Sequence, residues 1–297
     1  MPMFNPIPRV AAIHDLSGFG RASLTVIIPI LSTMGVQVCP LPTAVLSTHT
    51  GGFTGYRMVD LTDSMESFIE HWEALNLSFD AVYSGFLGSP LQIDIVKNFI
   101  RRFSKGEKSE TPLVVVDPVM GDDGTLYGPI GEKMVKEMRQ HITNAHIITP
   151  NFTEAAFLLD KEYSNSTTQQ QIKDWILELS QRGPRIVIIT SVPLSRHENV
   201  TSVVAYDQND GRFWRVNCNF IPAYYPGTGD IFTSVVVGSI LQGDSLPIAL
   251  DRAVQFVSIA IRATFGHSYP KREGVLLEKV LPNLRAPVVT STYELLE

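Results

Sequence analysis

Short apolar segments alternate with longer segments of helical periodicity along most of the chain. We predict the short segments to be buried β-strands, at 10–14, 36–41, 80–84, 113–116, 145–149 and 185–190. We predict the longer segments to be helices, at 22–34, 62–75, 91–103, 130–139, 155–159, 167–181, 231–241 and 248–265. Continuous apolar strands separated by helices are typical of a parallel sheet that helices cover on both faces. The pattern therefore predicts an α/β fold class.

Two later segments, 202–206 and 212–216, alternate apolar and polar residues, and an Asn-Asp-Gly turn at 209–211 stands between them. Alternation on both sides of such a turn indicates a β-hairpin, which we place at an antiparallel edge of the sheet. From Gly266 onward the pattern is less regular and indicates no function.

Polar or glycine-containing segments follow five of the predicted strands, at Asp15, Ser84, Asp117, Thr149 and Thr190. The carboxyl ends of parallel strands lie along the same edge of a sheet, and open α/β sheets bind their ligands there. We therefore expect two carboxylates and several hydroxyl groups to line a single crevice.

The segment Gly227-Thr228-Gly229-Asp230 directly precedes the apolar helix at 231–241. Glycines allow backbone conformations that other residues avoid, and the first N–H groups of a helix have no partner inside the helix. Such a helix end binds anions. Asp230 would then lie beside a bound phosphate and could accept a proton during phosphoryl transfer. The alternative is that Asp230 only caps the helix.

Asp117 and Glu154 are candidate ligands of a metal ion. Asp117 closes a buried strand, where a carboxylate is costly unless it is paired, hydrogen-bonded or bound to metal. Asn151 and Glu154 also fit a capping box, which is the alternative role for Glu154. Carboxylate oxygens suit Mg²⁺, and the hydroxyls of Thr190 and Ser191 could contact nucleotide phosphates.

The polar segment 43–56 has His49 and Thr50 at its centre and follows the second predicted strand. It is either a plain connection or a loop that holds a small polar ligand. The sequence alone leaves both readings open.

Composition and absent motifs exclude several classes of function. The chain has 297 residues, 44% of them hydrophobic, and a net charge of −6 with no block of Lys or Arg, which argues against nucleic acid and anionic membranes as partners. Residues 1–8 contain no apolar run, so we expect no signal peptide, and no segment suits a bilayer span. Two cysteines form no disulfide framework and indicate a reducing, cytoplasmic location. The sequence contains no P-loop, zinc-peptidase or nucleophile-elbow motif.

Four motifs, in this order along the chain, resemble those of a known family. The segment at 227–230 resembles the signature of the ribokinase-like superfamily, and those at 47–50, 117–121 and 149–154 resemble the vitamin B6 kinases. The similarity extends from about residue 9 to about residue 264. It implies one ribokinase-like kinase domain over 1–297, a three-layer sandwich with a mostly parallel central sheet.

The resemblance also implies a reaction and its components. The reaction is ATP-dependent phosphorylation of the 5′-hydroxymethyl group of pyridoxal, pyridoxine or pyridoxamine, in a homodimer that lacks a large separate lid. The implied cofactors are ATP and Mg²⁺, and a monovalent cation such as K⁺ is left open. The implied partners are these small molecules and a second copy of the chain.

The same resemblance implies residue roles, position by position. Asp230 matches the general base, and Gly227, Thr228 and Gly229 match the anion hole. Asp117 and Glu154 match acidic residues near the metal ion and the phosphates. The expected nucleotide contacts are Asn151, Thr190 and Ser191, and the expected acceptor contacts are Asp15, Ser17, His49, Thr50 and Phe86.

The sequence departs from the family pattern at the acceptor side. Well-known pyridoxal kinases carry Gln-Ser-His after the first strand, whereas residues 14–18 here are His-Asp-Leu-Ser-Gly, similar to a turn of the hydroxymethylpyrimidine kinases; Phe86 replaces a frequent Tyr. Asp15 could accept a hydrogen bond from an amino group or a protonated ring nitrogen. A B6 vitamer is the favoured acceptor, and a hydroxymethylpyrimidine or dual-specificity kinase is the alternative. A ligand-binding regulator without catalysis is a third reading, against which the intact Asp230 argues.

Overall fold

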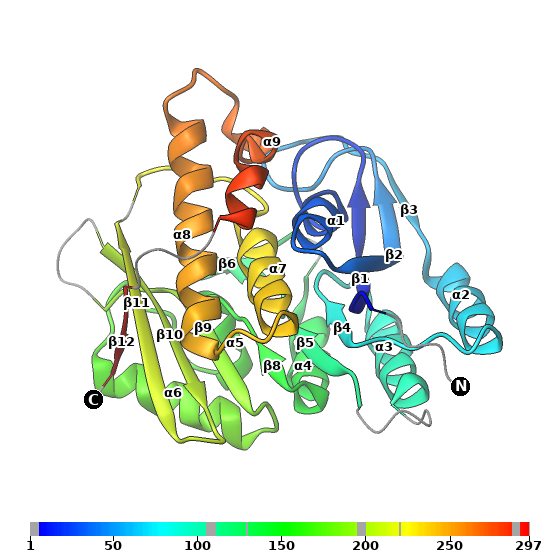
Figure 1. The fold of residues 1–297 in the computed structure, drawn as a ribbon, viewed down its shortest axis with the longest axis horizontal. Coiled ribbons are helices and arrows are strands. Elements are labelled where there is room, and N and C mark those ends of the chain that lie inside the picture. Colours follow the sequence, from blue (N-terminus) through cyan, green and yellow to red (C-terminus); the bar gives the residue numbers. More distant parts are fainter. Residues whose placement is uncertain are drawn as a thin grey trace.

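A computed structural model describes residues 6–104, 111–128, 130–194, 200–219, 221–286 and 292–296. Within them, ten strands form one sheet in the order β12-β11-β10-β9-β8-β5-β4-β1-β2-β3 (Figure 1). The central six strands, from β9 to β2, are parallel. The strands of the sheet are β1 Arg9–Ser17, β2 Gln37–Leu46, β3 Met58–Asp60, β4 Ala81–Ser84, β5 Leu113–Val116, β8 Ile147–Ile148, β9 Ile186–Val192, β10 Val200–Asp207, β11 Arg212–Asn219 and β12 Tyr293–Leu295.

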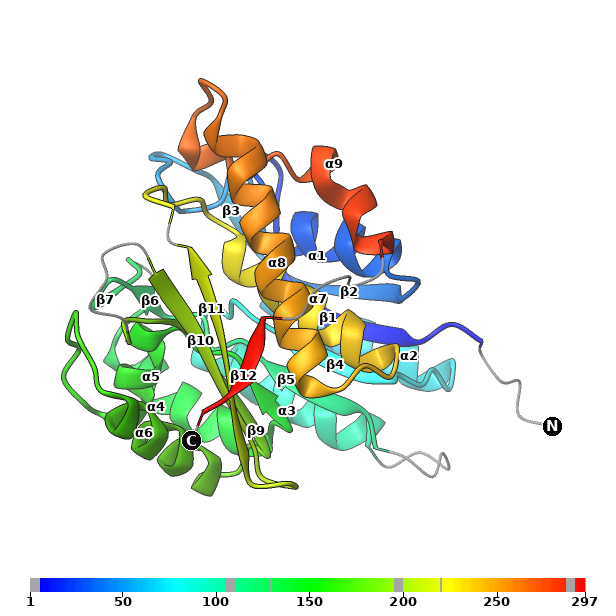
Figure 2. The same cartoon turned by 60° about the vertical axis from the view of Figure 1, so that its left-hand side comes forward.

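Helices cover both faces of this sheet (Figure 2). Both faces of the sheet are apolar, as strand β1 illustrates: Val10 and Ala12 lie in one hydrophobic core, and Ala11 and Ile13 lie in the other. The helices are α1 Leu24–Thr33, α2 Thr62–Ala74, α3 Pro90–Phe103, α4 Glu132–His141, α5 Phe152–Leu159, α6 Gln169–Gln181, α7 Thr228–Leu241, α8 Leu246–Phe265 and α9 Leu277–Val280. Helices α1, α7, α8 and α9 pack on one face and α2 to α6 on the other.

The predicted α/β class, with a mostly parallel sheet between two helical layers, is confirmed. The predicted hairpin is β10–β11, and its antiparallel pairing is confirmed. Strand β12, from the segment after Gly266, adds one more antiparallel strand beyond it. None of the described helices is long and apolar enough to cross a bilayer. That 1–297 forms one domain remains a prediction.

Three strands continue further than their apolar cores predict. Strand β1 includes Asp15 and Ser17, β2 includes residues 43–46, and β9 includes Ser191 and Val192. The pairing of β1 with β2 shifts register between His14 and Leu16, so a bulge places Asp15 at an irregular point of the strand. Backbone pairing with a neighbouring strand extends these elements through polar residues such as Asp15, Thr43 and Ser191.

A small second hairpin lies at the same end of the sheet. It consists of β6 Gly121–Asp122 and β7 Thr125–Leu126, joined by Asp123 and Gly124. Both joining residues have positive φ, 47° and 76°, as a two-residue hairpin turn requires. An Asp-Gly pair is a hairpin signal, so this element was readable from the sequence although the apolar pattern missed it.

Candidate active site

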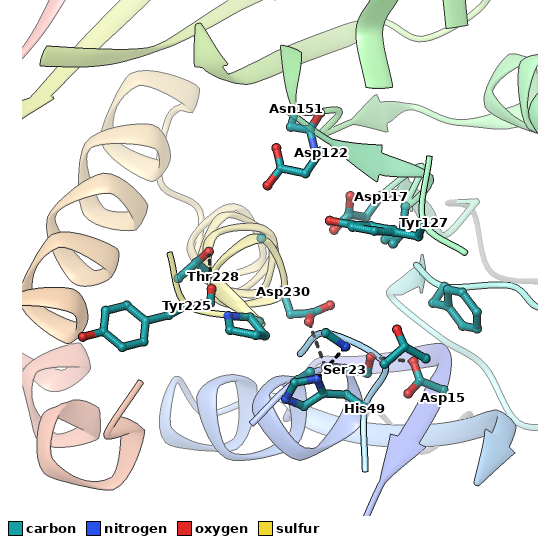
Figure 3. A pocket seen from close by; sticks show the side chains of 18 of the residues that line it. Asp15, Ser23, His49, Asp117, Asp122, Tyr127, Asn151, Tyr225, Thr228 and Asp230 are labelled. Carbon is teal, nitrogen blue, oxygen red and sulfur yellow. Dashed lines mark hydrogen bonds between the residues drawn. The ribbon is translucent and has the colours of Figure 1, made fainter. Parts of the chain in front are cut away.

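A cavity of about 450 Å³ opens at the carboxyl ends of the parallel strands (Figure 3). This volume is typical of a small-molecule site. Every predicted site residue except Ser17 lines the cavity: Asp15, His49, Thr50, Phe86, Asp117, Asn151, Glu154, Thr190, Ser191, Gly227, Thr228, Gly229 and Asp230. Ser17 is fully buried, and its hydroxyl donates to Asp15 Oδ2 at 3.3 Å. Ser17 therefore lies behind Asp15, because the extended strand carries it past the cavity wall.

Helix α7 presents its uncapped amino end to the cavity. Gly227 is the N-cap residue, with φ 81°, and no side chain caps the helix. A Cβ on Gly227 would lie 2.2 Å from the carbonyl oxygen of Arg21, so glycine is required on two counts. The free N–H groups of this turn can bind an anion.

Asp230 is not the cap of α7, which settles the alternative left open by the sequence. It stands in the first turn of the helix, and its Oδ2 accepts a hydrogen bond from the Ser23 backbone N–H at 2.8 Å. Burial raises the pKa of Asp230 to about 7, the Ser23 bond opposes that rise, and the nearby Asp15 charge adds to it. A carboxylate with a pKa near neutrality is suited to act as a general base.

Glu154 completes the predicted capping box of α5. Its Oε2 accepts from the Asn151 N–H at 2.8 Å, the Asn151 side chain accepts from the Glu154 N–H at 2.8 Å, and its Oε1 accepts from the Met120 N–H at 2.9 Å. Burial nonetheless raises the pKa of Glu154 to about 8, against the effect of these donors. The structural role of Glu154 is therefore confirmed, and its role near a metal remains a prediction.

Asp117 lies at the end of β5 with 5% of its surface exposed. Its pKa is raised well above the usual range by burial, and then by the charges of Glu154 and Asp230, while a Thr233 hydroxyl opposes the rise. Mutual repulsion of this kind is relieved when a cation binds between the carboxylates.

The charge of the cavity is strongly one-sided. Five carboxylates line it, those of Asp15, Asp117, Asp122, Glu154 and Asp230, and no Lys or Arg of the described chain does. The described residues contain no group of three or more His, Cys, Asp or Glu placed to hold a metal ion. The oxygen donors fit Mg²⁺, which is often bound through one or two carboxylates together with substrate phosphates.

Asp15 and His49 lie at one end of the cavity (Figure 3). His49 uses both ring nitrogens within the protein, since Nδ1 accepts from the Gly51 N–H at 3.1 Å and Nε2 bonds the Arg272 carbonyl at 2.7 Å. Burial lowers the pKa of His49, so the ring is neutral with its proton assigned to Nε2. His49 therefore shapes this end rather than offering it a free nitrogen.

The other end of the cavity contains Asn151, Thr190 and Ser191. The Asn151 Nδ2 donates to the Gly121 carbonyl at 2.8 Å, and its backbone forms a bridge to Thr190. Ser191 has φ 56°, a conformation rare for a residue with a Cβ and frequent at ligand sites.

Sequence reasoning missed several residues that line the cavity, among them Ser23, Asp122, Tyr127, Tyr224 and Tyr225. Ser23 donates hydrogen bonds to both Asp15 and Asp230. The β6–β7 hairpin places Asp122 and Tyr127, and the Tyr127 hydroxyl lies near that of Tyr224. The Asp-Gly turn was the available signal for the hairpin, whereas nothing near Ser23 marks it.

Comparison with known proteins identifies the family and the relatives of this chain. The model of the family described as phosphomethylpyrimidine kinase matches residues 28–272. The chain belongs to this family. Among curated relatives, the kinase is 30% identical to the pyridoxal kinase PdxY of Paraburkholderia xenovorans over 267 residues, 86% of this chain and 88% of that one. It is 29% identical to the pyridoxal kinase of Arabidopsis thaliana over 241 residues, 79% and 75% of the two chains.

Solved structures agree with this assignment. A Bacteroides thetaiotaomicron protein assigned as a phosphomethylpyrimidine kinase is 54% identical, with a TM-score of 0.94 over 99% of both chains. An orthorhombic form described with pyridoxal is 55% identical, with a TM-score of 0.93 over 97% and 99% of the two chains. The Lactobacillus plantarum pyridoxal kinase is 29% identical, with a TM-score of 0.82 over 94% and 97%. The resemblance to vitamin B6 kinases and the assignment as an ATP-dependent small-molecule kinase are confirmed.

Proposed function

We propose that this kinase transfers the γ-phosphoryl group of ATP to the 5′-hydroxymethyl group of a vitamin B6 vitamer, with Asp230 as the general base. One observation carries the proposal: Asp230 lies in the cavity between Asp15 and Asp117, at the uncapped end of α7 (Figure 3). The base therefore lies where an acceptor at one end would meet a phosphate at the other.

The chemical step can be written on these residues. Asp230 accepts the proton of the acceptor hydroxyl as the hydroxyl oxygen forms its bond to the γ-phosphorus. The bond from that phosphorus to the bridging oxygen breaks in line, and ADP leaves with the electron pair. The N–H groups of 227–229 stabilise negative charge on the transferred group. The Ser23 N–H keeps Oδ2 of Asp230 occupied, so Oδ1 is the oxygen left to take the proton.

Mg²⁺ would be held by Asp117, with Glu154 nearby, and would neutralise the charge of the phosphates. A metal ion is especially needed for this neutralisation because the described residues supply no Lys or Arg to the cavity wall. Asn151, Thr190 and Ser191 line the end of the cavity that we assign to the nucleotide. We further propose that the enzyme is a homodimer, as the resemblance implies, and that it is cytoplasmic, which agrees with Cys39 and Cys218 as free thiols.

The acceptor end favours a ligand with a protonated nitrogen. Asp15 is a buried carboxylate with two hydroxyl partners and, among the described residues, no cationic partner, so an N–H of the acceptor would complete its bonding. A B6 vitamer has a ring nitrogen of this kind, and the 55% identical structure described with pyridoxal supports this choice. A hydroxymethylpyrimidine, with its amino group, is the second candidate, because Asp15 suits it equally and the family model is described as a phosphomethylpyrimidine kinase, a name from the same class of pyrimidines.

The test is a panel of acceptors assayed with ATP and Mg²⁺. Pyridoxal, pyridoxine, pyridoxamine and hydroxymethylpyrimidine are supplied separately, and both ADP and the phosphorylated product are measured. We expect turnover on at least one B6 vitamer, with a higher kcat/KM than on the pyrimidine. Turnover on the pyrimidine alone would replace the proposal by its second candidate, and turnover on none would contradict both.

A further inference from the structure

Ser23 lies between the two carboxylates to which the proposed function gives different tasks. Its hydroxyl donates to Asp15 Oδ1 at 2.5 Å, and its backbone N–H donates to Asp230 Oδ2 at 2.8 Å (Figure 3). Along the chain these partners lie 8 and 207 residues away. A single residue thus joins the acceptor end of the cavity to the candidate base.

The Ser23 backbone has a conformation that serine rarely adopts. Its φ is 53° and its ψ is −134°, and a Cβ makes positive φ unfavourable. Ser23 precedes helix α1, yet its side chain caps no N–H of that helix although serine is a preferred capping residue. The hydroxyl turns to Asp15 instead. Strain of this kind persists where surrounding structure holds it, frequently at functional sites.

Contacts of Arg21, two residues before Ser23, hold this conformation in place. The Arg21 guanidinium pairs with Glu278 at 2.9 Å, and its carbonyl oxygen lies so close to Gly227 that only a glycine fits there. The loop is therefore fixed independently of the Ser23 side chain. Ser23 as a whole is 8% exposed, and its hydroxyl is available to act on Asp15.

We propose that Ser23 is a positioning residue that orients Asp15 toward a nitrogen of the acceptor while its main chain holds Asp230 in place. The inference rests on the proposed function, since it takes Asp230 as the base and Asp15 as the acceptor's anchor. It deepens that function by making acceptor binding depend on a hydroxyl that acts through Asp15.

The electrostatics of Asp15 agree with this role. Burial raises the pKa of Asp15, and the hydroxyls of Ser23 and Ser17 oppose the rise, with Ser23 the larger of the two. Without the Ser23 hydroxyl, Asp15 would lose its shorter hydrogen bond and its charged form would be less favoured. A neutral or misdirected Asp15 accepts a hydrogen bond from a cationic nitrogen less well.

The test is a double-mutant cycle on acceptor binding, measured by calorimetry with pyridoxine and no nucleotide. The variants are Ser23→Ala, Asp15→Asn and the double variant. Ser23→Gly also removes the hydroxyl but tolerates the positive φ, and Ser32→Ala, an exposed serine on α1, is the matched control. We expect Ser23→Ala and Ser23→Gly to weaken pyridoxine binding at least about tenfold, the usual effect of losing a hydrogen bond to a charged group.

In the Asp15→Asn background, Ser23→Ala should change the pyridoxine Kd by less than about twofold, because the two residues act as one unit. The Kd for ATP with Mg²⁺ should stay unchanged in every variant. An unaltered pyridoxine Kd in Ser23→Ala, or an equal loss with and without Asp15, would overturn the inference. Wild-type protein that binds pyridoxine without phosphorylating it would instead contradict the proposed function alone, and wild-type protein that does not bind pyridoxine would overturn the role of Ser23.

Discussion

At Asp230, burial and a single backbone donor act in opposite directions on one carboxylate. Burial raises its pKa to about 7, and the Ser23 N–H limits the rise. A base of ordinary carboxylate pKa would be too weak to take a proton from an alcohol efficiently, whereas one near 7 is matched to a neutral cell. The reactivity of this residue therefore comes from its position in the fold.

This position predicts the pH dependence of the reaction. Asp230 must be deprotonated to act as a base, so kcat/KM should rise with pH through an apparent pKa near 7 and level off above it. Below pH 6 it should fall about tenfold per pH unit. Steady-state rates from pH 5 to 9 test this, with circular dichroism as a check that the chain stays folded. An acid limb near pH 4 would show that the base is an unperturbed carboxylate.

Glu154 and Ser23 show which residue roles a sequence can reveal. The Asn151–Glu154 spacing predicts a capping box because both partners lie within one helical turn, and the structure has both bonds. Ser23 has no comparable signal, because its partner Asp230 is 207 residues away. Hydrogen bonds between residues close in sequence can be predicted from their spacing. Hydrogen bonds between residues far apart in sequence cannot.

At the scale of elements, the turn before α7 is the piece on which the site depends. Gly227 and Gly229 stand in the same turn but in different surroundings. Gly227 has φ 81° and faces the Arg21 carbonyl oxygen, whereas a Cβ on Gly229 would meet nothing within 4 Å. Gly227 is therefore required by the fold. Gly229 is not required by its surroundings, so its backbone N–H is free to bind an anion.

Gly227→Ala should lower the free energy of unfolding by about 3 kcal/mol, since it combines a positive φ with a backbone clash. Gly229→Ala is the control in the same turn and should change it by less than about 1 kcal/mol. Chemical denaturation of both variants measures the difference. Equal stability of the two would mean that the Arg21 loop moves freely away from α7.

The apolar pattern predicts long elements well and short ones poorly. Helix α7 and strand β5 are found because their apolar runs are continuous. Strand β12 and the β6–β7 hairpin are missed because their two or three residues per strand do not belong to a continuous apolar run. Such strands exist through pairing with a neighbour, and pairing leaves little trace in hydrophobicity.

At the scale of the whole molecule, the parallel sheet gathers the site from distant segments. The sequence predicts this gathering, because the carboxyl ends of parallel strands share one edge. The segment after Gly266 could not be interpreted from the sequence, yet it supports the same edge. Glu278 forms a salt bridge with Arg21, and the Arg272 carbonyl is hydrogen-bonded to His49. These contacts join segments more than 200 residues apart.

The central claim is that Asp230 is the base of a phosphoryl transfer to a B6 vitamer. The most direct measurement compares the kcat of the wild type and Asp230→Asn on the best vitamer, with the ATP Kd determined in parallel. Asp160→Asn is the matched control, an exposed carboxylate at the end of α5, and should keep wild-type activity. We predict that Asp230→Asn lowers kcat at least about 10²-fold with ATP binding retained; near-normal turnover in that variant would contradict the account.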